Sequence, residues 1–303
     1  MPEKDAGLAA RGVGSRTPSR RRSPLPAGLS RLLAEPFFGL FRIRENVRRP
    51  TALVLGGIPL ALLVAVWWAI TAGPSVEDRL VSPVILPSPA EVVGSFPSLW
   101  YQRALSRSIV TSLARVAAGF AVAAAVALPL GIAMGAFTKV KALFNPLSVM
   151  GSYLPIAAIV PLTLSWFGTG ETQKVMFLAI ASFVCLLPLV VRAIDDVDGV
   201  YLNTAYTLGA SRLQTVTKVL LGVAAPEIFN ALRLTVGVGW TYIILAEIVD
   251  AERGLGSLII ISQRRGPREH IYLVLLVIMG LAFVIDQLFI WAARALFPYR
   301  ERR

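Results

Sequence analysis

Histidine and cysteine are almost absent from this chain, which has one of each in 303 residues, His270 and Cys185. One cysteine excludes an intrachain disulfide, and one histidine with one cysteine forms neither a metal site nor a nucleophile–base pair. A membrane-embedded enzyme would need such a cluster. We therefore expect no catalytic residue, no metal and no cofactor.

Charged residues are also scarce, at 16% of the chain against about 25% in a typical soluble domain, whereas 55% of residues are hydrophobic. The apolar residues occur in long blocks, and about 20 apolar residues cross a bilayer as a helix. The sequence predicts an all-α polytopic membrane helix bundle with about six transmembrane helices. The expected spans are 51–71, 108–137, 145–167, 173–192, 228–250 and 271–293.

The first 50 residues differ in composition from the rest, because they are rich in Arg, Ser, Pro and Gly. We interpret 1–50 as a basic cytoplasmic tail and 51–303 as the transmembrane domain. Within the tail, 31–47 mixes Leu and Phe with Arg, which predicts an amphipathic helix on the inner membrane surface. A cleavable signal is not expected, since the first apolar run starts late and is too long.

The formal net charge is +12. If both termini are cytoplasmic, about two thirds of the 30 Lys and Arg lie in inner segments, as the positive-inside rule requires. Arg264, Arg265 and Arg268 would lie outside and weaken this bias. Because the basic residues flank the spans, we expect contact with a lipid bilayer and not with nucleic acid.

Small residues and prolines mark the second and third spans. A small residue recurs at every fourth position of the second span, which predicts close packing against another helix of the chain. These residues are Gly119, Ala123, Ala127, Gly131 and Gly135. We expect Pro129 to bend the second span, and Pro155 and Pro161 to bend the third.

The charges inside the spans are Arg115, Glu247 and Asp286, and each needs a partner or water. Glu247 follows Trp240 and Tyr242 in the fifth span. One interpretation makes Trp240, Tyr242 and Glu247 the wall of a polar substrate pathway. The other makes Glu247 an interfacial carboxylate paired with Arg253. Arg115 either neutralises Asp286 or snorkels to the outer surface.

The longest inner connection, 193–227, has an amphipathic helical stretch at 211–221. This helix rests on the membrane surface or inserts into a cytoplasmic partner. The chain has no Walker A pattern, so any ATPase must be a separate polypeptide. It also has no chain of intramembrane acidic residues, which argues against a proton-coupled carrier.

Residues 203–221 resemble the "EAA" loop of binding-protein-dependent ABC importer permeases, in which Glu-Ala-Ala is followed by Gly and then by Ile, any residue, Leu-Pro. Ala205, Gly209, Val219 and Leu221 match this pattern. It is broken where Asn203 replaces Glu, Thr204 replaces Ala and Gly222 replaces Pro, which puts one polar contact to the ATPase in doubt.

The resemblance covers about 75–300. The segments 86–92, 112–120, 128–135, 226–240, 246–256 and 280–286 are similar to the nitrate/sulfonate/taurine/bicarbonate branch. It implies the type I ABC importer permease fold, with a cytoplasmic coupling helix at about 203–214 that docks on an ATPase. The coupling residues it implies are Asn203, Thr204, Ala205, Tyr206, Leu208, Gly209, Ala210, Ser211 and Arg212.

The function that the resemblance implies is import of a small anion as the permease subunit, without an ATPase site of its own. Its partners would be cytoplasmic ABC ATPase subunits, a periplasmic or lipid-anchored substrate-binding protein and a second permease copy, with a homodimer expected. The location implied is the bacterial inner membrane, multi-pass, with both termini cytoplasmic. The alternative is a secondary transporter or channel subunit without an ATPase partner, which would need repeated halves or a charge relay.

Overall fold

The computed structural model describes residues 47–73, 79–250 and 252–299, and every regular element in these ranges is helical. The amphipathic helix expected at 31–47 and nearly all of the basic tail lie outside the described residues. The chain divides into two units, Met1–Val66 and Trp67–Arg303, and each is described by itself.

The described part of the first unit belongs to α2 (Arg49–Thr71), which ends in the second unit. Its 22 residues from Pro50 to Thr71 are apolar enough to cross a membrane. At 1.5 Å per residue they extend about 33 Å, close to the roughly 30 Å of a bilayer's hydrocarbon core. Its leucine side chains, such as Leu53 and Leu60, are exposed and available to lipid.

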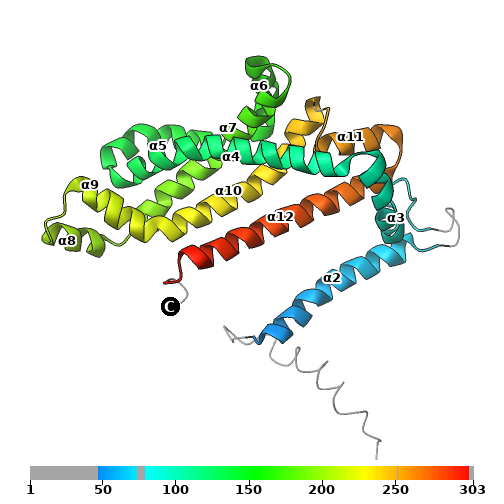
Figure 1. The fold of residues 1–303 in the computed structure, drawn as a ribbon, viewed down its shortest axis with the longest axis horizontal. Helices are drawn as coiled ribbons and strands as arrows, with labels where there is room; N and C mark the ends of the chain where they lie inside the picture. Colours follow the sequence, from blue (N-terminus) through cyan, green and yellow to red (C-terminus); the bar gives the residue numbers. More distant parts are fainter. Residues whose placement is uncertain (1–46, 74–78, 251, 300–303) are drawn as a thin grey trace, which may run out of the picture. The chain divides into compact units, whose positions relative to one another are not determined.

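Four long helices make up most of the described part of the second unit (Figure 1). They are α4 (Leu105–Ala136), α7 (Glu171–Asp195), α10 (Leu221–Asp250) and α12 (Arg268–Leu296). The shorter elements near the start of α4 are α3 (Pro89–Gly94), the π-helical turn η1 (Ser98–Gln102) and α11 (Leu255–Arg265). Those at the other end are α8 (Gly199–Thr207), α9 (Arg212–Gln214) and the π-helical turn η3 (Thr215–Leu220).

The small residues of α4 pack against α7, as the sequence predicts. A Cβ added at Gly119 would lie 2.6 Å from the Leu178 side chain, and one at Gly131 would lie 2.8 Å from Val190. These contacts advance in step along both helices, so α4 and α7 run parallel. Close backbone approach through glycine gives the van der Waals contact that drives helix association in lipid.

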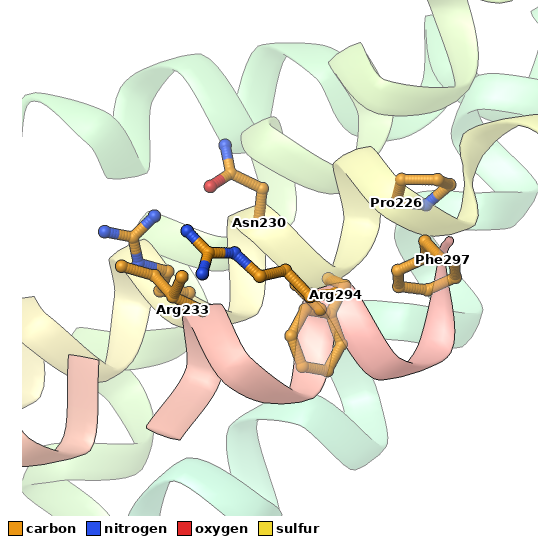
Figure 2. A pocket seen from close by; sticks show the side chains of 8 residues that line it. Pro226, Asn230, Arg233, Arg294 and Phe297 are labelled. Atoms are coloured by element: carbon orange, nitrogen blue, oxygen red, sulfur yellow. The ribbon is translucent and has the colours of Figure 1, made fainter. Parts of the chain in front are cut away.

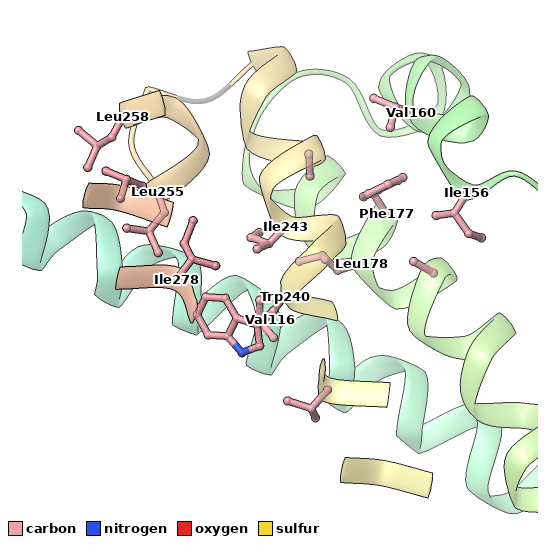
Figure 3. Packing of buried hydrophobic residues seen from close by; sticks show 14 of the residues in the cluster. Val116, Ile156, Val160, Phe177, Leu178, Trp240, Ile243, Leu255, Leu258 and Ile278 are labelled. Atoms are coloured by element: carbon pink, nitrogen blue, oxygen red, sulfur yellow. The ribbon is translucent and has the colours of Figure 1, made fainter. Parts of the chain in front are cut away.

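The apolar core of the second unit joins α4, α7, α10, α11 and α12 (Figure 3). Val116, Phe177, Trp240, Ile243 and Ile278 are among its buried members. Aromatic packing continues between α10 and α12, where Phe229 and Phe289 lie 5.5 Å apart between ring centroids. The core therefore holds α10 between the α4–α7 pair and α12.

The third expected span, 145–167, is bent sharply at Pro155, one of the two prolines expected to bend it, and the bend is a complete break of the helix. The chain makes α5 (Thr138–Ser152), then the 3₁₀ turn η2 (Ile156–Ile159) and α6 (Val160–Phe167), and the two parts meet at 92°. Pro155 stands at the break, where proline disfavours a helical conformation of the residue before it.

Helices occupy the other five expected ranges to within one residue and extend beyond them. Five helices are long and apolar enough to cross a membrane, or up to six if the bent pair is one span. The predicted all-α bundle with about six transmembrane helices is confirmed for the described residues.

Candidate functional site

The turn after α8 is built around Gly209, whose φ of 76° lies in the left-handed region. The Gly209 N–H donates to the Tyr206 carbonyl at 3.0 Å, and the Ala210 N–H donates to the Ala205 carbonyl at 2.9 Å. This pair of bonds is a Schellman motif, which ends a helix sharply and satisfies its last carbonyls. A residue with a side chain is strained at that φ. The turn therefore requires glycine at position 209, which the resemblance had singled out.

A second helix starts immediately after this turn. The Ser211 hydroxyl accepts the Gln214 N–H, and the Gln214 side chain accepts the Ser211 N–H, which is a capping box. From Arg212 the helix continues through α9, η3 and α10 as one 38-residue segment to Val249. The helical stretch expected at 211–221 is therefore present, but it is not a separate helix between spans, because these residues are the first turns of α10's helix.

The expected coupling residues divide between these two helices. Asn203 to Thr207 lie in α8, Leu208 to Ala210 form the turn, Ser211 caps and Arg212 begins the second helix. Ala205 is buried. The expected residues that are exposed are Asn203, Thr204, Tyr206, Leu208, Gly209, Ser211 and Arg212.

The surface of α8, its turn and α9 exposes large apolar side chains beside polar ones. Leu208 is 82% exposed and Leu213 is 73% exposed, and Val200, Tyr201 and Tyr206 are exposed as well. Large apolar side chains that stand together on a surface indicate a contact surface for another molecule. We call this set the α8 surface.

At the opposite end of the bundle, Arg115 joins three helices. Its Nη1 donates to Glu247 Oε1 of α10 at 2.7 Å and to the Arg253 carbonyl at 2.7 Å. Its Nε donates to Glu171 Oε2 of α7 at 2.6 Å, and its Nη2 bonds the other Glu171 oxygen. Arg115 is 4% exposed and Glu247 is 1% exposed, so the arginine charge lies buried between two carboxylates.

Glu247 has two further hydrogen bonds, one from α4 and one from the start of α11. The Ser112 hydroxyl donates to Glu247 Oε1 at 2.7 Å, and the Gly256 N–H donates to Oε2 at 2.8 Å. A Cβ at Gly254 would lie within 2.5 Å of both carboxylate oxygens, so only glycine fits there. We call Ser112, Arg115, Glu171 and Glu247 the Arg115 network.

These contacts correct the pairings expected from the sequence. Arg115 neither neutralises Asp286 nor snorkels outward, because it is buried against Glu171 and Glu247. Asp286 instead pairs with Arg233, through Nε–Oδ1 at 2.5 Å and Nη2–Oδ2 at 2.9 Å. The Glu247 carboxylate pairs with Arg115, and Arg253 contributes its backbone carbonyl, which accepts from the same arginine.

The three expected pathway residues do not form one cluster. Trp240 and Glu247 are two turns apart on the buried face of α10. Tyr242 is half-buried and packs edge-on against Phe177 of α7, with ring centroids 6.4 Å apart.

Sequence reasoning missed Ser112 and Glu171. Ser112 stands three residues before Arg115 and so shares its helix face, which is a signal that periodicity offers. Glu171 stands at the first position of α7, where nothing in the sequence connects it with α4.

Most of this chain is similar to known proteins. Residues 127–299 match the family model described as "Binding-protein-dependent transport system inner membrane component". The taurine transport system permease protein TauC of Escherichia coli is 31% identical over 248 residues, which cover 80% of this chain and 88% of TauC. The putative aliphatic sulfonates transport permease protein SsuC of Bacillus subtilis is 25% identical, over 86% of this chain and 92% of SsuC.

The fold also matches a solved structure. A chain of the inward-facing MetNI methionine ABC transporter superposes with a TM-score of 0.59 at 21% identity, over 66% of this chain and 97% of that one. The family match and the apolar helices make the chain a multi-pass inner-membrane protein and a transport permease. It belongs to the binding-protein-dependent inner membrane components of ABC importers.

Proposed function

We propose that this permease imports a small anion of the nitrate, bicarbonate, sulfonate or taurine class and that the α8 surface couples it to separate ATPase subunits. Family membership favours this role over a secondary transporter or channel. The anion class is supported by relatives named for taurine and aliphatic sulfonate transport. ATP hydrolysis belongs to the ATPase, since the sequence has no Walker A pattern.

One observation supports the coupling role most directly: α8 exposes large apolar side chains and ends in a rigid turn. Leu208, Tyr206 and Leu213 are exposed in this chain, and burying such side chains in a partner is favourable by about 1.5–3 kcal/mol each. The Schellman turn and the capping box fix the angle between α8 and the following helix. A displacement of α8 is therefore passed on as a displacement of that helix.

The helix that follows the turn is anchored at its other end. The helix that begins at Arg212 reaches Val249, and Glu247 near its end is bonded to α4 and, through Arg115, to α7. Rigid elements that have two arrangements can carry coupling between distant sites. In this proposal Trp240, Tyr242 and Glu247 act on the substrate route through the position of α10.

The assembly is proposed to be a homodimer with both termini cytoplasmic, so that two α8 surfaces meet two ATPase subunits. A periplasmic or lipid-anchored binding protein delivers the anion to the end that carries the Arg115 network. The ATPase distinguishes two positions of α8 and so shifts the bundle between inward-open and outward-open states. Most basic residues then lie on the cytoplasmic side, in agreement with the positive-inside rule.

The proposal is tested by Gly209→Val, with Gly199→Val as the matched control. Gly209 has a φ of 76°, whereas the φ of Gly199, at the start of α8, is not positive, and an added Cβ would meet nothing within 4 Å at either glycine. We expect Gly209→Val to reach the membrane but to lose most uptake and most co-purification with the ATPase. Normal uptake and co-purification in Gly209→Val would remove the coupling role from this turn.

A further inference from the structure

The two ends of α12 have different surroundings. Toward its last turn, a pocket of about 390 Å³ lies between α10 and α12, and Figure 2 shows Asn230, Arg233 and Arg294 in its lining. Neither arginine is free, since Arg233 pairs with Asp286 and Arg294 also has an interaction. Near its first turns, α12 contacts α3 instead. The surface around α3 exposes apolar side chains that the described residues leave uncovered.

Two hydrogen bonds hold the chain that leads into α3. Trp67 Nε1, which belongs to the second unit and stands one turn before the end of α2, donates to the Pro87 carbonyl at 3.0 Å. The Tyr272 hydroxyl, from the second turn of α12, donates to the Ile85 carbonyl at 2.7 Å. Trp67 and Tyr272 stand near the ends of helices that are long and apolar enough to cross a membrane. Residues 85–87 therefore lie at the level where hydrocarbon meets water.

From this level the chain continues as a short helical segment. The Leu99 N–H donates to the Ser95 carbonyl at 3.1 Å and so connects α3 with η1. Figure 1 shows α3 crossing the direction of α4. The chain changes direction at Ala104, whose φ of 49° is left-handed and separates η1 from α4. Since α4 is long and apolar enough to cross the membrane, a helical segment across its end lies along the membrane surface.

This segment, 89–102, has one side packed on the bundle and a polar edge beside it. At about 100° per residue, its buried side chains fall in one sector of the helix. They are Val92, Ser95 and Leu99. Its polar side chains fall in the neighbouring sector, and they are Glu91, Ser98 and Gln102. The Ser98 hydroxyl donates to Gln102 Oε1 at 3.3 Å, and Arg79 Nη1 donates to Glu91 Oε1 at 2.9 Å. The polar edge is thus suited to face water.

The remaining sector of the segment is apolar and exposed. Val93 is 66% exposed and Tyr101 is 83% exposed. Phe96 and Trp100 are exposed as well, and their rings stack with centroids 5.5 Å apart. We call Val93, Phe96, Trp100 and Tyr101 the α3 face. Trp and Tyr are enriched at the boundary between hydrocarbon and headgroups, because each combines an apolar ring with a polar N–H or O–H.

We propose that 89–102 is an interfacial helix whose α3 face docks into the lipid headgroup region at the end of the bundle opposite α8. A bilayer is favoured over a protein partner because the α3 face continues from the ends of two membrane-crossing helices, where lipid is already present. With both termini cytoplasmic, the leaflet is the outer one. Because Ala104 joins the segment directly to α4, the docked face holds the start of α4 at a fixed depth.

The test places a nitroxide spin label on single cysteines in the full chain, which carries Cys185→Ala and is reconstituted in phosphatidylcholine nanodiscs. Val93→Cys probes the α3 face, and Gln102→Cys on the polar edge is the matched control, since both positions are exposed. Oxygen partitions into hydrocarbon, whereas a nickel chelate stays in water. We expect oxygen to relax the label at position 93 more than nickel does, and the reverse at position 102. Equal nickel access at the two positions overturns the proposal.

A second measurement needs no label and applies even if a cysteine variant does not fold. Phospholipids brominated on their acyl chains quench nearby indoles, so the wild type in such discs should lose more fluorescence than Trp100→Phe. Trp240→Phe removes a buried indole and should leave the quenched signal unchanged. Equal quenching in the wild type and Trp100→Phe contradicts lipid contact.

A protein occupant is distinguished by adding the purified substrate-binding protein to the labelled discs. If the label at position 93 is open to nickel until that protein is added, the α3 face docks a protein, and lipid docking is overturned. If nickel is excluded before the addition, the bilayer covers the face. Neither readout involves the ATPase, so the outcome is independent of the coupling role of the α8 surface.

Discussion

The two ends of the helix bundle differ in what they bury: one end buries hydrogen-bonded charges, and the other leaves large apolar side chains exposed. At one end, Arg115 and Glu247 are almost fully buried and are hydrogen-bonded to each other and to further residues of this chain. At the other, the α8 surface exposes Leu208 and Leu213. The first end is complete in one chain, whereas the second has apolar area that only another molecule can cover. Mutations should therefore affect the stability of this chain at the Arg115 network and its association with partners at α8.

The largest expected effect on stability is that of Arg115→Met. It leaves the Glu247 carboxylate buried without its cation, and removal of one member of a buried ion pair costs about 3–5 kcal/mol. We expect a marked fall in the midpoint of thermal unfolding in detergent. The double variant Arg115→Met with Glu247→Leu should recover part of the loss, since no buried charge is left.

Arg107→Met is the control, because Arg107 is an exposed residue of the same helix. If Arg115→Met unfolds at the same temperature as Arg107→Met, the Arg115 network does not stabilise its end of the bundle.

A smaller effect is expected where α4 and α7 touch. Gly131→Ala places a Cβ 2.8 Å from the Val190 side chain, and overpacking of this kind costs typically about 1–3 kcal/mol. Gly280→Ala in α12 meets nothing within 4 Å and should leave the unfolding midpoint unchanged. Equal unfolding midpoints for both alanine variants would show that α4 and α7 can move apart at Gly131 without a loss of stability.

Features that depend on nearby residues could be predicted from the sequence. Apolar runs located the long helices, and the four-residue period of Gly119 to Gly135 predicted close packing of the second span against another helix, which the structure identifies as α7. The Gly209 turn was reached by resemblance to a known loop, and its physical cause is also local, because the hydrogen bonds of the motif join residues three to five apart.

Pairings between distant residues could not be predicted. Arg115 and Glu247 are 132 positions apart, and several intramembrane charges offered plausible partners. The choice depends on the register of α4, α7 and α10, which packing sets and which no local pattern reveals. Pro155 predicted a bend in the third span, but the 92° angle between α5 and α6 could not be predicted, since hydropathy does not distinguish a slightly bent span from a broken one.

The capping box of α3 should give a small, pH-dependent effect. Burial would raise the pKa of Glu91, but the Ser88 N–H and the Arg79 guanidinium outweigh it and lower that pKa below its ordinary value. A lowered pKa stabilises the fold above the ordinary value of about 4.3, and the gain is lost as pH falls through the lowered pKa.

Glu91 is 40% exposed, so the gain is expected to be below about 1 kcal/mol. It is measured as hydrogen exchange of the α3 amides, corrected for intrinsic rates, in the wild type and Glu91→Gln. The two should differ at neutral pH and converge in acid. A difference that is the same at both pH values would show that the Glu91 charge has no part in it.

Leu208→Ser should have the smallest effect on the stability of the chain itself. It therefore tests the contrast between the two ends most sharply, because any loss of ATPase binding cannot come from unfolding. Leu208 is 82% exposed, and exposed substitutions usually change stability by less than about 0.5 kcal/mol. If Leu208 anchors the ATPase, its loss should weaken that association by about ten- to a hundredfold, because burying a leucine contributes about 1.5–3 kcal/mol. Leu80→Ser, at a residue that is 81% exposed outside the α8 surface, should change neither quantity. A side chain that is buried in the ATPase cannot be removed without loss of affinity. If the Leu208→Ser and Leu80→Ser permeases bind the ATPase equally tightly, Leu208 is therefore not part of the docking contact.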